Sequence, residues 1–159
     1  MRPPGARLNR NICRTRAAVS FIVGSPPYNE SPSAMAHPRR FSARIVNHIA
    51  SRAALRIRAG DTHRFLGIWA VVVDGRVFVR SWTLKKQGWN RALREDPRGA
   101  ILIADKEVPV RARHPRSERL LSAIDRAYRE KYMSPGSRKY AVGLTRGRRR
   151  ASTTELIPR

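Results

Sequence analysis

The stretch FLGIWAVVVDGRVFVRSW, residues 65–82, decides the expected fold of this chain. Two runs rich in β-branched and aromatic residues lie on either side of the pair Asp74-Gly75. An Asp-Gly pair between two such runs is the sequence signature of a tight β-hairpin, because both residues tolerate the left-handed backbone that the turn needs. The stretch therefore predicts an antiparallel hairpin that turns at Asp74 and Gly75.

Further elements are expected on both sides of this hairpin. Ile45, Val46 and Ile49 fall on one stripe at helical spacing. They predict a short helix at 42–53, with Ser42 as its N-cap. The other expected elements, in chain order, are a strand at 54–59, a helix at 88–97, a pair of strands at 99–105 and 107–113, a helix at 117–132, and closing strands at 139–145 and 153–158.

The order of these elements indicates the fold class. A helix is followed by several antiparallel strands with one short helix inserted, and then by a longer helix and the final strands. About six short strands with little alternation between strand and helix favour a small antiparallel barrel over a parallel sheet. We therefore expect an α+β fold in which a small antiparallel barrel is flanked by helices.

Length and composition set bounds on the kind of protein. A chain of 159 residues is expected to form one domain, and no apolar run approaches the ~20 residues that a membrane-spanning helix needs. The net charge of +23 is typical of a protein with a polyanionic partner such as nucleic acid. However, 29 of the 34 basic residues are arginine, a skew that GC-rich coding produces without selection for binding. The cations are also spread along the chain. RGRRR at 146–150 is the one dense block, and we interpret it as an exposed basic turn between the final strands.

The sequence shows no catalytic or metal-binding constellation. The single cysteine, Cys13, excludes an internal disulfide, so a reduced, cytoplasmic setting is expected. The four histidines have no spacing that would gather metal ligands, and no metal site is expected. No pair of carboxylates is visible for acid-base work, and Ser81 has no His or Asp near it in sequence. The catalytic residues therefore stay unknown.

The first 40 residues differ in composition from the rest. They hold six of the 11 prolines and are rich in Arg, Ser and Asn. The apolar stretch AAVSFIVG at 17–24 is short for the core of a signal peptide, and a poor cleavage context follows it. Met35 begins a stretch that looks like a natural start. We expect residues 1–40 to be a disordered or mis-started tail and residues 41–159 to form the domain.

The strand that leaves the hairpin ends in hydroxyls and cations. Alternation places Arg80 between Phe78 and Trp82 on one face, as in a ligand floor or a partly covered sheet face. Phosphate binding needs N–H and O–H donors, fixed positive charge and the positive end of a helix. A solvated hairpin end, whose cations prevent edge pairing, is the alternative. The candidate phosphate contacts, all expected to face solvent, are Arg80, Ser81, Thr83, Lys85 and Lys86.

Four motifs in this order resemble the split β-barrel flavin-binding proteins. They are VVVDGRVFVRSW, WNRALREDPR with its Trp-x3-Leu-x3-Pro spacing, VPVRAR, and IDRAYREKY. The ending RASTTELIPR adds to a resemblance that is closest to the bacterial domain-of-unknown-function family 2255. A wider resemblance reaches the deazaflavin-dependent nitroreductase-like and pyridoxamine-phosphate-oxidase-like proteins. The resemblance to family 2255 covers roughly residues 41–159.

The resemblance implies a split β-barrel, commonly a homodimer, that holds a phosphorylated flavin-type cofactor at the end of its third strand. The cofactor would be FMN or the deazaflavin F420, and the protein an oxidoreductase of unknown substrate. Two alternatives stay open: a basic nucleic-acid-associated protein, and a cofactor-free split-barrel interaction module. The cofactor-binding residues that the resemblance implies are Arg80, Ser81, Trp82, Thr83, Lys85, Lys86 and Trp89.

Overall fold

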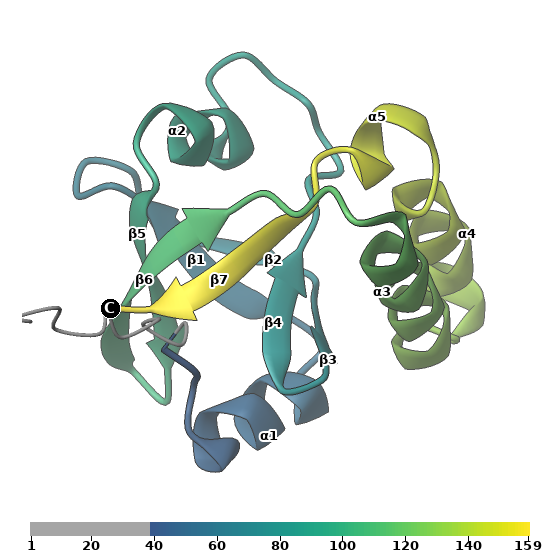
Figure 1. Ribbon diagram of the computed structural model, residues 1–159, viewed down its shortest axis with the longest axis horizontal. Coiled ribbons are helices and arrows are strands. Elements are labelled where there is room, and N and C mark those ends of the chain that lie inside the picture. The colour runs from purple at the N-terminus through teal and green to yellow at the C-terminus, as the bar shows by residue number, and fades with distance from the viewer. Residues whose placement is uncertain (1–38) are drawn as a thin grey trace, which may run out of the picture. The chain divides into compact units, whose positions relative to one another are not determined.

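The structure is a computed structural model that describes residues 39–159 (Figure 1). Nearly all of the expected tail, residues 1–40, lies outside the described residues. In chain order the elements are α1 (Ala43–Ser51), β1 (Leu55–Ala59), β2 (Leu66–Ile68), β3 (Ala70–Val73), β4 (Arg76–Val79), α2 (Trp89–Glu95), β5 (Arg98–Ile103), β6 (Lys106–Arg113), α3 (Glu118–Lys131), α4 (Pro135–Leu144), α5 (Gly147–Arg150) and β7 (Thr154–Pro158).

All seven strands form one antiparallel sheet in the order β2-β1-β5-β6-β7-β4-β3. The two edge strands, β2 and β3, are consecutive in the chain and are separated only by Trp69. The sheet must therefore curl until its edges approach each other, and it forms a nearly closed barrel (Figure 1). The prediction of an α+β fold with an antiparallel barrel is confirmed.

The predicted hairpin turn is confirmed. Asp74 and Gly75 have φ values of 52° and 70°, so both occupy the left-handed region that a two-residue hairpin turn requires. The run before the turn differs from the prediction, because it is two strands rather than one. β2 pairs with β1 while β3 pairs with β4, and Trp69 lies at the break. The other strand pair, β5 and β6, turns at Ala104 and Asp105.

The two faces of β4 pack into two different apolar cores. Val77 and Val79 belong to the core inside the barrel, which also includes Phe41 at the start of the described chain. Phe78 belongs to a second core outside the barrel, beneath α3 and α4. Because both faces of β4 are buried, a charged side chain that continues either face must find partners inside the protein.

Two predictions for the C-terminal part are wrong. The segment expected as a closing strand at 139–145 falls mostly within helix α4. Pro135 has the fixed backbone angle that suits a first helical turn, and Ala141 and Leu144 are buried three positions apart against the outer core. The basic block at 146–150 is not a turn between strands, because α5 connects α4 to β7. Within residues 39–159, no helix combines the length and the apolar composition that crossing a membrane requires.

Candidate functional site

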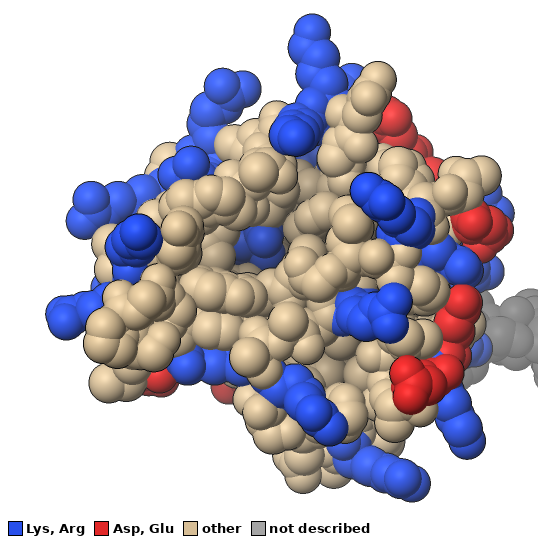
Figure 2. All heavy atoms as spheres, turned by 180° about the vertical axis from the view of Figure 1, so that it is seen from behind, with Lys and Arg blue, Asp and Glu red and all other residues tan. Residues whose placement is uncertain are grey.

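A pocket of about 350 Å³ opens where β4 ends. All three tryptophans of the chain line it, together with Tyr140 from α4. We call it the aromatic pocket, and its remaining lining residues are Leu66, Gly67, Ile68, Arg80, Ser81, Thr83 and Leu144. Figure 2 shows a hollowed face with basic atoms at the bottom of the hollow, and Arg80 is the one basic residue among those that line the pocket.

Five of the seven predicted site residues line this pocket, and two do not. Arg80, Ser81, Trp82, Thr83 and Trp89 come together there from the end of β4 and the start of α2. Lys85 and Lys86 are exposed in the loop between them and are not part of the lining. The structure thus groups the predicted aromatic and hydroxyl residues and leaves the two loop cations outside.

The aromatic walls are held by contacts with the helices. Trp69 stacks on Tyr132 of the α3 C-cap, with ring centroids 4.1 Å apart and planes 7° apart. Tyr140 meets Trp82 edge to face at 4.9 Å. Aromatic pairs in these arrangements contribute about 0.5–1.5 kcal/mol beyond the area they bury. Trp82 and Tyr140 remain 38% and 40% exposed, so their rings are available to a ligand.

Trp82 is positioned by α4 and α5. A Cβ atom on Gly143 of α4 would lie 2.7 Å from the Trp82 ring, so the close approach of the ring requires glycine at that position. The guanidinium of Arg149 lies 3.9 Å from the ring centroid, and its Nε donates to the Trp82 carbonyl at 3.1 Å. The ring is therefore positioned by the backbone of α4 and by a cation.

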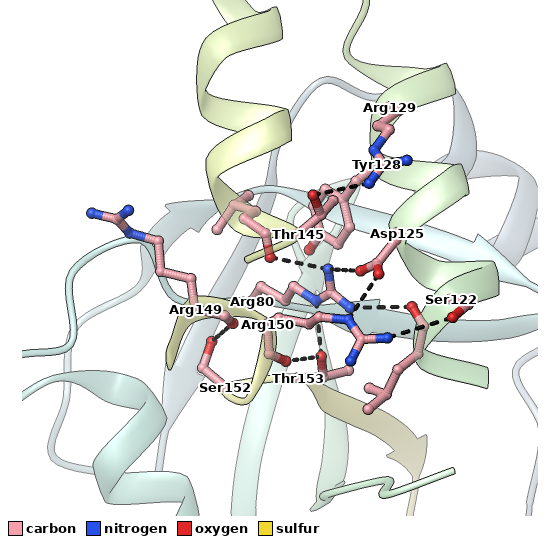
Figure 3. Close-up of polar contacts among 12 residues, drawn as sticks. Arg80, Ser122, Asp125, Tyr128, Arg129, Thr145, Arg149, Arg150, Ser152 and Thr153 are labelled. Carbon is pink, nitrogen blue, oxygen red and sulfur yellow. Dashed lines mark hydrogen bonds and ion pairs between the residues drawn. The ribbon is translucent and has the colours of Figure 1, made fainter. Parts of the chain in front are cut away.

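Arg80 is buried in the protein, and the prediction that it faces solvent is wrong. It is 2% exposed, because it continues the outer face of β4 that α3 and α4 cover. Its Nη1 donates to the carboxylate of Asp125 at 2.6 Å and to the carbonyl of Leu144 at 3.0 Å, and its Nε donates to the Thr153 hydroxyl at 2.8 Å (Figure 3). The contact between Arg80 and a ligand, made from the pocket floor, remains a prediction.

The carboxylate of Asp125 is shared by two arginines. Its second oxygen accepts from Nε of Arg150 at 2.8 Å (Figure 3). Arg150 also pairs with Glu118 at the start of α3. The hydrogen bonds that Arg150 donates to Glu118 and then to Asp125 raise the pKa of Arg150, and the bond that Glu118 accepts from Arg150 lowers the pKa of Glu118. Two cations and two anions thus form one neutral cluster beneath the pocket.

Ser81 is held by the loop before β7. Its backbone N–H donates to the Ser152 hydroxyl at 2.9 Å, and its own hydroxyl donates to the Thr83 carbonyl at 2.7 Å. The side-chain amide of Asn90 in α2 donates to the Ser152 carbonyl at 3.0 Å. These bonds fix the backbone at the pocket, and they leave the Ser81 hydroxyl engaged within its own turn.

Sequence reasoning missed three contributors to this site. Trp69 was not among the predicted site residues, and Tyr140 lay in a segment expected to be a strand, yet both line the pocket. The sequence did contain a signal for Asp125, because this carboxylate falls on the apolar stripe of α3 between Leu121 and Tyr128. A carboxylate on a buried stripe needs a cationic partner. Among residues 39–159, no group of three or more His, Cys, Asp or Glu side chains is placed to hold a metal ion.

Comparison with other proteins identifies a family. Residues 44–156 match the family described as uncharacterized proteins conserved in bacteria (DUF2255). The chain is similar to a solved conserved hypothetical protein from Mycobacterium tuberculosis, with 15% identity, a TM-score of 0.49, and coverage of 77% of this chain and 81% of that one. It is also similar to an FAD-binding protein from Mesorhizobium loti, with 15% identity, a TM-score of 0.44, and coverage of 76% and 90%. No curated protein matches the chain.

Proposed function

We propose that this chain, which belongs to the DUF2255 family of uncharacterized proteins conserved in bacteria, binds a flavin-type cofactor in the aromatic pocket at the end of β4. The cofactor is FMN or the deazaflavin F420, and the protein acts through it as an oxidoreductase. Ser81, Trp82, Thr83 and Trp89 contact the cofactor. Arg80 supports the pocket floor.

The gathering of all three tryptophans and Tyr140 around one pocket carries this proposal. Pockets for small ligands have volumes of roughly 300–1,000 Å³ and are lined mainly by apolar and aromatic side chains with a few polar groups. The aromatic pocket fits that description with its volume of about 350 Å³. A flavin or deazaflavin ring is planar and apolar on its faces, so aromatic walls suit it.

The chain supplies position rather than reactive groups. A bound flavin or deazaflavin would supply the hydride or electron chemistry. Trp69 and Trp82 are each held in place by a neighbouring side chain, which gives the walls a defined shape. The neutral cluster around Asp125 fixes Arg80 at the floor without adding net charge there. An enzyme of this kind needs no conspicuous catalytic side chain.

Titration of FMN and F420 onto the purified protein tests the proposal. Every tryptophan of the chain lines the pocket, so quenching of the intrinsic fluorescence reports on occupancy directly. We expect saturable quenching that Trp82→Ala weakens and that Met133→Ala, at a side chain 70% exposed on another surface, leaves unchanged. An absence of quenching by either ligand up to about 1 mM, which corresponds to a binding free energy near −4 kcal/mol, would reject the proposal.

The resemblance to split-barrel proteins also implies a homodimer, and we propose that this protein forms one. Trp82, Leu84 and Tyr140 are exposed apolar side chains near the pocket, as a surface available for a second copy would require. Light scattering during size-exclusion chromatography measures the mass in solution. A mass near 18.1 kDa at micromolar concentration would show a monomer instead.

A further inference from the structure

A second hollow, of about 730 Å³, lies beside the aromatic pocket and shares Trp82 and Thr83 with it. We call it the basic hollow, and its other lining residues are Leu84, Gly143, Arg146, Gly147, Arg148 and Arg149. The two hollows share residues and therefore adjoin each other, as one ligand with a planar ring and a charged side chain would require. We infer that the phosphate of such a ligand binds in the basic hollow to Arg146 and Arg148, and not to Arg80.

Arg80 is a poor phosphate contact because its charge is already neutralised. Nη1 and Nε donate to Asp125, Leu144 and Thr153 at distances of 2.6–3.0 Å. A phosphate that drew the Arg80 guanidinium away would leave the buried carboxylate of Asp125 with only one of its two cationic partners. That loss would be unfavourable in free energy. Fixed positive charge for a phosphate must therefore come from another part of the surface.

The arginines of the basic hollow carry charge that no carboxylate of the described residues neutralises. Among the ion pairs of residues 39–159, none involves Arg146, Arg148 or Arg149. Arg146 and Arg148 are exposed, so their guanidinium groups can form the paired N–H contacts that suit phosphate oxygens. At least two guanidinium groups that form no ion pair within residues 39–159 therefore line the basic hollow.

Arg149 connects the aromatic and the cationic parts of this surface. Its guanidinium lies over the Trp82 ring, whereas the next residue, Arg150, points into the Asp125 cluster. Figure 3 shows Arg149 directed away from that cluster. The basic block at 146–150 therefore has two roles: Arg150 is structural, and the arginines before it face the hollow that adjoins the aromatic pocket.

The ligand class follows from this arrangement. It is a planar aromatic heterocycle that carries a phosphorylated side chain, with the ring in the aromatic pocket and the phosphate in the basic hollow. This inference rests on the proposed function, since it assumes that the ring binds beside Trp82. It goes further by assigning the phosphate to residues that the resemblance does not imply.

Riboflavin and FMN provide the test, because they share a ring and differ only in the phosphate. Hydrogen bonds between the arginines and the phosphate add to the free energy of binding. FMN should therefore bind the wild-type protein about ten- to a hundredfold more tightly than riboflavin. We expect the double variant Arg146→Ala/Arg148→Ala to bind FMN only as tightly as riboflavin and to bind riboflavin unchanged. F420 and its phosphate-free core extend the comparison to the deazaflavin.

A matched control separates a specific contact from general charge. Arg126→Ala/Arg138→Ala removes the same charge from exposed positions on α3 and α4 that line a different hollow, and it should preserve the preference for FMN. Equal binding of riboflavin and FMN to the wild-type protein would overturn the inference and leave the proposed function standing. An equal loss of the preference in both double variants would also overturn the inference, because general charge would then explain it.

Inorganic pyrophosphate tests the basic hollow without any ring. Calorimetry should show pyrophosphate binding that Arg146→Ala/Arg148→Ala weakens at least tenfold. If neither flavin nor deazaflavin binds but pyrophosphate does so through these arginines, the proposed ring site fails and the phosphate assignment stands. If pyrophosphate does not bind either, both are wrong. A single-stranded oligonucleotide that binds through the same arginines more tightly than FMN would reassign the hollow to nucleic acid and overturn the inference.

Discussion

At the scale of single residues, Arg80 shows how a strand can carry a charge into a core. It follows Phe78 on the outer face of β4, and α3 provides Asp125 opposite it. Asp125 in turn binds Arg150, so each buried charge has a partner of opposite sign. Such a cluster adds little net stability relative to apolar packing, yet removing one member is costly, because it leaves the others uncompensated.

Arg80→Ala should therefore lower the free energy of unfolding by about 3 kcal/mol, near the lower end of the range for a broken buried pair because Arg150 still binds Asp125. Urea denaturation measures the loss. Arg146→Ala, at an exposed position that makes no ion pair within residues 39–159, is the control and should change stability by less than about 0.5 kcal/mol. A similarly small effect of Arg80→Ala would show that the cluster does not hold the outer core together. Arg80→Met combined with Asp125→Leu should recover most of the loss, because both charges are then gone.

Lys131 gives the fold a measurable pH dependence. Its half-buried amine donates to the carbonyls of Ile49 and Ala70, each at 2.8 Å, and burial lowers its pKa from 10.5 to about 8. Between these values the unfolded chain retains a proton that the folded chain has released. The unfolded state binds more protons there, so this residue makes stability rise with pH from about 8 toward 10.5.

The variant Lys131→Gln lacks this titration and provides the reference. The free energy of unfolding of the wild-type protein, minus that of the variant, should increase between about pH 8 and pH 10, as urea denaturation at each pH will show. Above that range the buried tyrosines add an opposite trend, since burial raises the pKa of Tyr132 to about 12. A difference that stays flat from pH 8 to pH 10 would contradict the assignment.

At the scale of elements, α4 both covers the outer core and shapes the pocket. Its two glycines meet different surroundings: a Cβ on Gly143 would lie 2.7 Å from the Trp82 ring, and a Cβ on Gly136 would meet no atom within 4 Å. Alanine is favoured over glycine inside a helix by up to about 1 kcal/mol. The two positions should therefore respond in opposite directions to the same substitution.

Gly136→Ala should raise the free energy of unfolding by up to about 1 kcal/mol. Gly143→Ala should lower it by about 1–3 kcal/mol, because the added methyl group overpacks against Trp82. The displaced ring should also shift the tryptophan emission spectrum in Gly143→Ala and not in Gly136→Ala. Thermal denaturation and fluorescence measure both effects. Equal stabilisation by the two substitutions would mean that Trp82 does not pack against α4.

The sequence predicted those elements whose signals are local. The hairpin turn at Asp74 and Gly75 needed only two residues with left-handed backbone, and α3 needed only a stripe at helical spacing. The strand expected at 139–145 became part of α4 because a short apolar run does not distinguish strand from helix, and packing on the outer core decided the outcome. The apolar run on both sides of Trp69 is continuous in sequence, so only the closure of the sheet showed that it divides at Trp69 into β2 and β3.

The candidate site was predicted only in part, for a related reason. Five of the predicted residues are close in sequence and come together at one pocket. The burial of Arg80 depends on Asp125, which lies 45 positions away, and no local pattern reports a pairing over that distance. Tyr140 reaches the pocket only because α4 is a helix, so the wrong element assignment concealed a site residue as well.

At the scale of the whole molecule, the charge of +23 favours association with polyanions, but its distribution limits the strength of that association. Figure 2 shows basic side chains scattered over one face, with acidic ones among them at its edge, rather than gathered in a stripe. Several of the arginines are bound to carboxylates within the protein, as Arg76 is to Glu155. Dispersed cations give affinity that depends on salt more than on sequence.

Oligonucleotide binding should therefore be weak and should fall steeply with salt. A protein that makes 6–10 phosphate contacts loses roughly 10³–10⁵ in affinity between ~50 and ~200 mM salt, whereas a ligand with one phosphate loses far less. Fluorescence anisotropy of a labelled oligonucleotide and tryptophan quenching by FMN, measured on the same protein over this range, compare the two directly. We expect the oligonucleotide signal to disappear near physiological salt while FMN binding changes by less than about tenfold, because FMN carries a single phosphate group. Tight, sequence-selective oligonucleotide binding that persists at physiological salt, with FMN binding absent, would make nucleic acid the partner of this basic surface.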